Sequence, residues 1–230
     1  MVIGIISEGK EDFAVIEIIL ETLAKNNENI VFSEFEVYPI RPSLFQDETD
    51  LSDTTIGTFQ GVKNACESKT ELDMFLSIVD NEYIVIHLDT AEIDNHDFVF
   101  QRPNKNEDNY STELRNLVIE IINEWLENSH KENLFYAIAI EEIESWCLTV
   151  FENKDTTSII NSKEKLSIFL EKNNLTAKKL KCNPNDRIKY FQKFLKKKEF
   201  HKIKELEKYA TKNQSMRDFI ESIKNEFDKL

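Results

Sequence analysis

The segment VIGIISEGKED, residues 2–12, joins a continuous apolar run to a cluster of charged side chains. Val2–Ile6 shows no alternation of apolar and polar residues, which is typical of a strand buried on both faces of a parallel sheet. Residues 10–24 follow as a predicted amphipathic helix. Ligands of such sheets bind outside the carboxyl ends of the strands, so we expect functional side chains at Glu8 and Asp12.

Apolar runs and helical stretches alternate in this way through the first 150 residues. Further strands are predicted at residues 34–38, 83–88 and 134–140. Helices are predicted at residues 58–78 and from Ser111, a candidate cap, to Trp125. Long loops are predicted at residues 41–57 and 93–110, and loops of this length are more often functional than decorative. The pattern predicts an α/β fold with a mainly parallel sheet of about four strands, flanked by helices.

The overall composition fits one or two globular domains and excludes a disordered or fibrous chain, with 230 residues of which 40% are hydrophobic. The three cysteines form no CxxC pair, so neither a disulfide framework nor a zinc site is indicated, and a reducing cytoplasmic compartment is expected. No apolar run reaches the roughly 20 residues that a membrane-spanning helix needs. We therefore expect a cytoplasmic protein without a membrane partner.

The net charge of −14 is divided unevenly along the chain. Residues 1–160 carry 10 basic and 33 acidic side chains (net −23), whereas residues 161–230 carry 19 basic and 10 acidic (net +9). From about Thr156 the sequence is helical and Lys-rich, and Asn183-Pro184 marks one predicted helix start. We predict an α/β domain at residues 1–155 and a helical C-terminal region at residues 156–230 that packs on it.

Carboxylates follow three of the predicted strands at the point where each ends. They are Glu8 and Asp12, then Asp89, then Glu141, Glu142 and Glu144. Two carboxylates about 4 Å apart repel by roughly 4 kcal/mol at an effective dielectric constant near 20, so such a cluster binds protons or a cation. Oxygen ligands without cysteine or a histidine pair favour Mg²⁺ or Mn²⁺. Two such ions catalyse phosphodiester displacement in many enzymes, which makes this reaction class the natural expectation.

The spacing leaves several points open. Glu8 and Asp12 can reach one ion if the helix begins near Gly9, whose lack of a side chain would permit a tight turn. Glu142 and Glu144 share a face if the chain stays extended, whereas Glu141 and Glu144 share one if a helix has begun. Acidic residues at helix starts are also ordinary caps that complement the helix dipole. His87 is interpreted as a packed side chain or as one that supports the neighbouring ligands, rather than as a ligand itself, and Trp146 as a core anchor rather than a stacking platform.

These motifs together resemble the Toprim fold of topoisomerases, primases and many bacterial nucleases. The resemblance covers about residues 1–150. It rests on the apolar strand leading into Glu8-Gly9 with Asp12, on the strand leading into Asp89, and on the IEEIESW segment (residues 140–146). The chain is similar to small Toprim-like proteins of bacterial defence and mobile-element loci, and to the Toprim half of the overcoming-lysogenization-defect nucleases.

The resemblance implies roles for individual residues. Glu8 would be a metal ligand or general base, Asp12 a ligand of the same ion, and Asp89 the first acid of an Asp-x-Asp motif. Glu142 with Glu144 would hold a second ion. Ala91 replaces the second Asp of that motif. Either Glu92 or Asp94 substitutes for it, or one metal site is weak or absent.

Two functional hypotheses follow from these residues. The first is a Mg²⁺- or Mn²⁺-dependent nuclease with Glu8 and Asp89 as catalytic residues. Its basic C-terminal region, with Lys178-Lys179 and Lys196-Lys197-Lys198, would grip DNA or RNA. The second is a non-catalytic Toprim-like module that works with an ATPase partner, which Ala91 favours. A receiver-like phospho-acceptor is disfavoured, because Gly9 stands where that fold needs a second acid.

Overall fold

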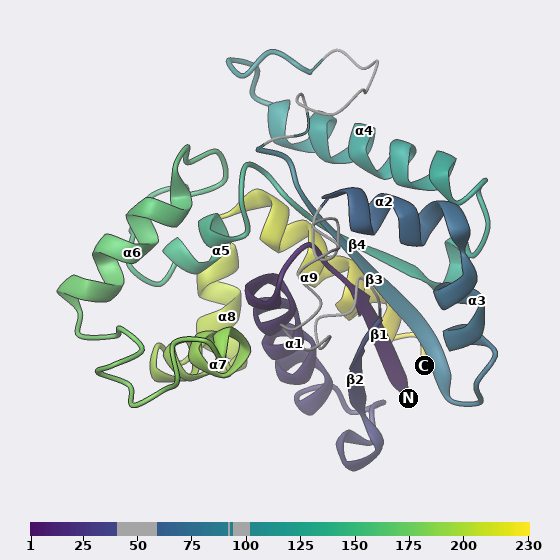
Figure 1. Cartoon of the computed structure of the whole chain (residues 1–230), viewed down its shortest axis with the longest axis horizontal. Helices are drawn as coiled ribbons and strands as arrows, with labels where there is room; N and C mark the ends of the chain where they lie inside the picture. The colour runs from purple at the N-terminus through teal and green to yellow at the C-terminus, as the bar shows by residue number, and fades with distance from the viewer. Residues whose placement is uncertain (41–58, 92, 94–101) are drawn as a thin grey trace.

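A computed structural model describes residues 1–40, 59–91, 93 and 102–230 of the chain (Figure 1). Its centre is a parallel sheet of four strands in the order β2-β1-β3-β4. The strands are β1 (Val2–Ile6), β2 (Glu36–Pro39), β3 (Asn81–Asp89) and β4 (Leu134–Ala139). The predicted α/β class with a parallel sheet is confirmed.

The register of the strands brings their carboxyl ends to one edge of the sheet. Ile6 of β1 pairs with Ile86 of β3, and Asp89 at the end of β3 pairs with Ala139 of β4. The prediction of β1 is confirmed to the residue, whereas β2 begins two residues later than predicted. The reason is a short 3₁₀ helix, Phe32–Glu34, which occupies the start of the predicted strand.

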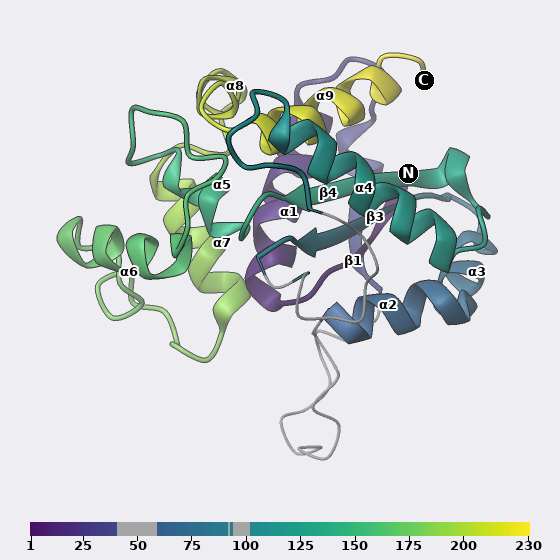
Figure 2. The ribbon, with the colours of Figure 1, turned by 90° about the horizontal axis from the view of Figure 1, so that it is seen from above.

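Helices cover both faces of the sheet. They are α1 (Lys10–Lys25), α2 (Phe59–Ser68), α3 (Thr70–Leu76), α4 (Tyr110–Trp125), α5 (Glu144–Leu148), α6 (Ser162–Lys172), α7 (Arg187–Lys197), α8 (Ile203–Ala210) and α9 (Gln214–Phe227). Successive residues of a strand point to opposite faces. Val85 accordingly packs with α1, α5 and the C-terminal helices, while Ile84 and Ile86 pack with α2, α3 and α4. Figure 2 shows α2 and α9 on opposite sides of the strands.

Three details of the sequence-based prediction are wrong. The predicted helix 58–78 is two helices, because Lys69 adopts a left-handed backbone conformation (φ 57°) between α2 and α3. Ser111 is no cap, since α4 begins at Tyr110 after Asn109. α7 begins at Arg187 rather than at Asn183-Pro184, because the Asp186 side chain accepts a hydrogen bond from the Lys189 N–H and caps the helix there. The predicted loop 41–57 and residues 94–101 of the predicted loop 93–110 lie outside the described residues.

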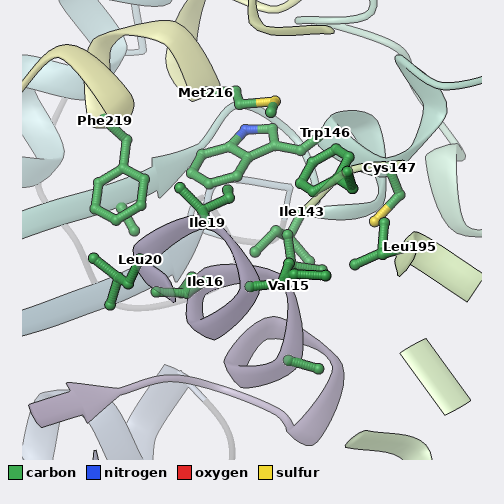
Figure 3. Packing of buried hydrophobic residues seen from close by; sticks show 14 of the residues in the cluster. Val15, Ile16, Ile19, Leu20, Ile143, Trp146, Cys147, Leu195, Met216 and Phe219 are labelled. Atoms are coloured by element: carbon green, nitrogen blue, oxygen red, sulfur yellow. The ribbon is translucent and has the colours of Figure 1, made fainter. Parts of the chain in front are cut away.

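The C-terminal helices share a hydrophobic core with the sheet. Trp146 of α5 is fully buried and stacks on Phe219 of α9, with 5.8 Å between ring centroids (Figure 3). Its indole N–H donates to the hydroxyl of Ser215 at 2.9 Å. The prediction of a core anchor is confirmed, while the division at residue 155 stays a prediction. In the ranges described above, no helix combines the length and apolar character that crossing a membrane requires.

A buried polar network around Asn213 fixes the start of α9 against α5. The Asn213 side-chain amide donates to the hydroxyls of Ser145 (3.3 Å) and Thr156 (3.1 Å). Its carbonyl oxygen accepts from the Met216 N–H and from the Ser215 hydroxyl, both at 3.0 Å. Asn213 therefore caps α9 and also holds the segment that leads into the acidic edge of the sheet.

We expect Asn213→Ala to lower the free energy of unfolding by about 2–4 kcal/mol, because it removes a helix cap and leaves buried hydroxyls without partners. Urea unfolding measures the effect. Asn153→Ala, at an exposed position, serves as the control and should change stability by less than about 0.5 kcal/mol. Equal destabilisation by both variants would contradict the prediction.

Candidate functional site

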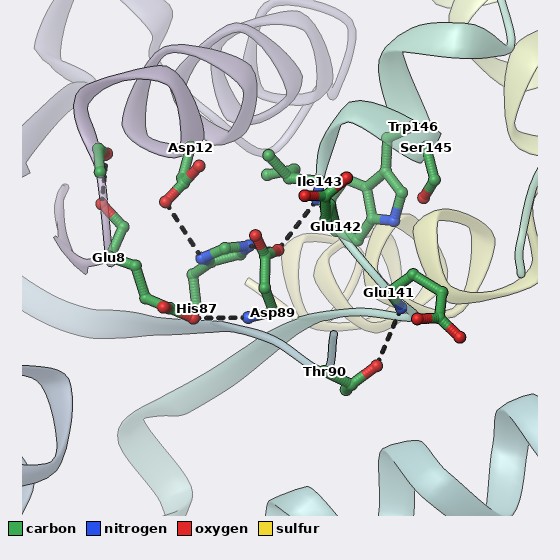
Figure 4. Close-up of polar contacts among 12 residues, drawn as sticks. Glu8, Asp12, His87, Asp89, Thr90, Glu141, Glu142, Ile143, Ser145 and Trp146 are labelled. Carbon is green, nitrogen blue, oxygen red and sulfur yellow. Dashed lines mark hydrogen bonds and ion pairs between the residues drawn. The ribbon is translucent and has the colours of Figure 1, made fainter. Parts of the chain in front are cut away.

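Hydrogen bonds tie together the carboxyl ends of β1, β3 and β4. A Glu8 carboxylate oxygen accepts from the Asp89 backbone N–H at 2.7 Å. The Asp89 carboxylate accepts in turn from the Ile143 backbone N–H at 2.9 Å. Beside them, the Thr90 hydroxyl accepts from the Glu141 N–H at 2.8 Å (Figure 4). The three predicted acidic clusters therefore meet at one edge of the sheet.

Asp12 joins this edge from the first turn of α1. Its negative charge in this first turn complements the helix dipole. Gly9 itself has an extended backbone (φ −147°, ψ 170°) that any residue adopts, so the predicted reason for a glycine is wrong. A Cβ at position 9 would lie only 3.2 Å from an Asp12 carboxylate oxygen, so the glycine instead leaves room for the Asp12 side chain.

The alternatives among the last three acids are decided by the backbone at Glu141. This residue has a left-handed conformation (φ 64°), and its carboxylate faces Lys105 at 2.8 Å, away from Asp89. Glu142 accepts from the Ser162 hydroxyl (2.8 Å) and from the Lys163 N–H (3.1 Å) at the start of α6. Glu144 is buried in the first turn of α5. Glu142 and Glu144, rather than Glu141, thus belong to the cluster with Asp89.

Burial and mutual repulsion raise the pKa values of four of these acids. Burial and the charge of Asp89 raise the pKa of Glu8 to about 8. Burial, followed by the charges of Asp12, Glu144 and Glu142, holds the pKa of Asp89 well above its usual range. Burial and the charge of Asp12 raise the pKa of Glu144 to about 7, and burial raises the pKa of Asp12 itself. The cluster is therefore unstable as a set of bare anions and favours protons or a cation.

His87 lies inside this cluster, where the sequence left open whether it only packs in the core or supports the ligands. The ring is fully buried, with Nδ1 3.6 Å from an Asp12 carboxylate oxygen and Nε2 3.3 Å from one of Asp89. Neither ring nitrogen forms a hydrogen bond with any described residue. The strand period was an available signal, because His87 and Asp89 are two residues apart and so point to the same face.

Two basic residues of the C-terminal region border the acidic edge, and the sequence offered no sign of either contact. The positive charge of Lys163 in α6 lies near Glu144, and this carboxylate is the main cause that raises the pKa of the lysine. Arg187 at the start of α7 forms an ion pair with Glu11. Glu11 is therefore engaged with α7, whereas its neighbour Asp12 faces the cluster.

The acids lie close together but are not arranged around a common point. Among the residues with described positions, no three His, Cys, Asp or Glu side chains are placed to hold a metal ion. Glu8, Asp89 and Glu142 each accept hydrogen bonds from the protein instead. Position 91 supplies no carboxylate, and Glu92 and Asp94 lie outside the described residues.

The donor set still suits a hard divalent cation. It offers carboxylate oxygens with raised pKa values, and such groups gain from a positive charge beside them. Comparison of this chain with protein-family models, with curated proteins and with solved structures found no match.

Proposed function

We propose that this chain is a Mg²⁺- or Mn²⁺-dependent, Toprim-like nuclease that hydrolyses phosphodiester bonds of DNA or RNA. The observation that carries the proposal is the meeting of partly buried, mutually repelling carboxylates at the carboxyl edge of a parallel sheet. We further propose that it works in the bacterial cytoplasm, in phage defence or mobile-element biology, as the resemblance to Toprim proteins implies.

The residues that would hold the ions are Glu8, Asp12, Asp89, Glu142 and Glu144. A bound divalent ion would stabilise negative charge on the attacking and leaving oxygens of the phosphodiester. Glu8 is suited to a second task, since a carboxylate beside the bound ions could accept the proton of the attacking water, as the resemblance to Toprim proteins implies. We therefore assign Glu8 the role of general base and Asp89 that of the central ligand.

Exposed lysines in the C-terminal region, on α7 and in the connection from α6 to α7, support a polyanionic substrate. The open lysine set consists of Lys178, Lys179, Lys193 and Lys197, which are exposed and form no ion pair with a described residue. The paired lysine set consists of Lys202, Lys208, Lys224 and Lys229, each of which contacts a glutamate within 2.8 Å. The segment with the open set touches the acidic edge through Lys163 and Arg187. A nucleic-acid backbone on this segment would therefore lie next to the carboxylates.

Replacing all four lysines of the open set by Gln should weaken nucleic-acid binding. Each lysine that contacts a phosphate releases about 0.9 counterions from double-stranded DNA, so the slope of log K against log salt should become shallower by up to about 3.6. Fluorescence anisotropy at several salt concentrations measures this slope. The same change in the paired set alters the net charge equally and should leave the slope nearly unchanged. Equal effects of the two variants would refute a role for the open set.

The proposal is tested by incubating the protein with plasmid, single-stranded DNA and RNA in Mg²⁺, in Mn²⁺ and in EDTA. Cleavage that EDTA abolishes supports the nuclease. The alternative is a non-catalytic Toprim-like module with an ATPase partner, and the alanine at position 91 favours it. If the protein cleaves none of these substrates and calorimetry detects no binding of Mg²⁺ or Mn²⁺, the nuclease proposal is refuted and the non-catalytic module is favoured.

A further inference from the structure

We infer that His87 is a positioning residue that holds the carboxylates of Asp12 and Asp89 in the arrangement needed to bind a divalent ion. The inference rests on the proposed metal-dependent function. It concerns a side chain from the middle of a buried strand, to which neither the acidic motifs nor the resemblance to Toprim proteins assigns a role.

The first step is the place of the ring. His87 lies in β3 between the apolar Ile86 and Leu88 and has no exposed surface. A buried imidazole without a hydrogen bond costs free energy that a leucine or valine would not. A histidine at this position therefore needs a reason other than packing.

The second step is what the ring faces. Its two nitrogens point to carboxylates from two different elements, at 3.6 Å to Asp12 of α1 and at 3.3 Å to Asp89 of β3 (Figure 4). Both distances exceed an ordinary N–H···O hydrogen bond by a few tenths of an ångström. A small rotation of either carboxylate would close the contact. With either contact closed, the ring would restrict the orientation of that acid, and its position between α1 and β3 puts both acids within its reach.

The third step is the consequence for a bound ion. Groups that hydrogen-bond to metal-ligating carboxylates fix their orientation, and their loss typically lowers metal affinity tenfold to a hundredfold. His87 is the one described side chain that reaches both Asp12 and Asp89 by an ion-pair or hydrogen-bond contact. We therefore expect it to set the geometry of these two ligands.

The first measurement is a double-mutant cycle in EDTA with His87→Ala, Asp12→Asn and the double variant, read by urea unfolding midpoints. If the ring holds Asp12, the midpoint shift caused by Asp12→Asn should be more stabilising, or less destabilising, in the His87→Ala background than in the wild type. The same shift in both backgrounds would overturn the inference. This measurement does not depend on metal binding.

The second measurement is the Mn²⁺ affinity of the full chain by calorimetry. We expect His87→Ala to lower it about tenfold to a hundredfold and His87→Gln, which keeps one donor and one acceptor, to restore part of it. Leu88→Ala is the matched control, since it removes a neighbouring buried side chain of β3. It should lower the unfolding midpoint and leave the Mn²⁺ affinity within about threefold.

The two measurements separate failure of this inference from failure of the proposed function. If the wild type binds no Mn²⁺, the proposed function fails, and the cycle in EDTA alone decides whether His87 holds Asp12. If the wild type binds Mn²⁺ and His87→Ala binds it equally well, the role of His87 is refuted while the metal site stands.

Discussion

Asp89→Asn should reduce metal-dependent cleavage more than about a hundredfold. Loss of a group that only hydrogen-bonds to a metal ligand lowers activity about tenfold to a hundredfold, and loss of the ligand itself should cost more. Asp89 has the most central place in the cluster. Its backbone N–H donates to Glu8 and its carboxylate accepts from Ile143. An asparagine keeps a carbonyl oxygen for Ile143 and the same backbone N–H for Glu8. The edge of the sheet should therefore keep its shape while the negative charge is lost.

The same variant should be more stable than the wild type at neutral pH without metal. The charges of Asp12, Glu144 and Glu142 oppose ionisation of Asp89, and a neutral side chain removes that repulsion. Loss of activity together with a higher unfolding midpoint separates a functional role from a structural one. Replacement of a residue with a structural role would lower both the activity and the unfolding midpoint.

Glu141→Gln is the control for this prediction. Glu141 is as buried as Glu144 but faces Lys105, so activity should stay within about threefold of the wild type. The midpoint of Glu141→Gln should fall, since the lysine loses its partner. Wild-type activity of Asp89→Asn, or an equal loss in Glu141→Gln, would contradict the proposed site.

The sequence predicted the meeting of Glu8, Asp12 and Asp89 because two local signals were enough. Apolar runs identified β1 and β3, and parallel strands place the residues that follow them at one edge. The direction of Glu141 was not predictable in this way. It depends on the left-handed backbone conformation of this one residue. Residues other than glycine rarely adopt that conformation, and no pattern in the IEEIESW segment indicates it.

The contacts of Lys163 and Arg187 with the acidic edge were beyond the sequence for a different reason. Both residues belong to the C-terminal region, for which the sequence predicted helices rich in lysine but not their packing. Which of their side chains faces Glu144 or Glu11 depends on how α6 and α7 pack beside α1 and α5. Such packing arises from side chains far apart along the chain, such as Trp146 and Phe219, and not from local spacing.

Without metal, the protein should lose stability as the pH rises from about 4.5 to about 8. The ordinary pKa of a glutamate is 4.5, and burial with the charge of Asp89 raises that of Glu8 to about 8. Between these values the folded state binds more protons than the unfolded state, so each step upward in pH favours unfolding. The free energy of unfolding should therefore fall by several kcal/mol across this window. Urea unfolding at fixed pH values in EDTA measures this change.

Mg²⁺ should reverse this loss at pH 8 and have little effect at pH 5, because protons occupy the carboxylates at the lower pH. At a hundred times its dissociation constant, a ligand that binds only the folded state adds about 2.7 kcal/mol of stability. Glu17 provides the control, since burial raises its pKa to about 7 but it contacts Gln192 of α7. Glu17→Gln should reduce the pH dependence and keep the full Mg²⁺ effect, whereas Glu8→Gln should reduce both. A Mg²⁺ effect that is equal at pH 5 and pH 8, or that survives Glu8→Gln unchanged, would place the ion elsewhere.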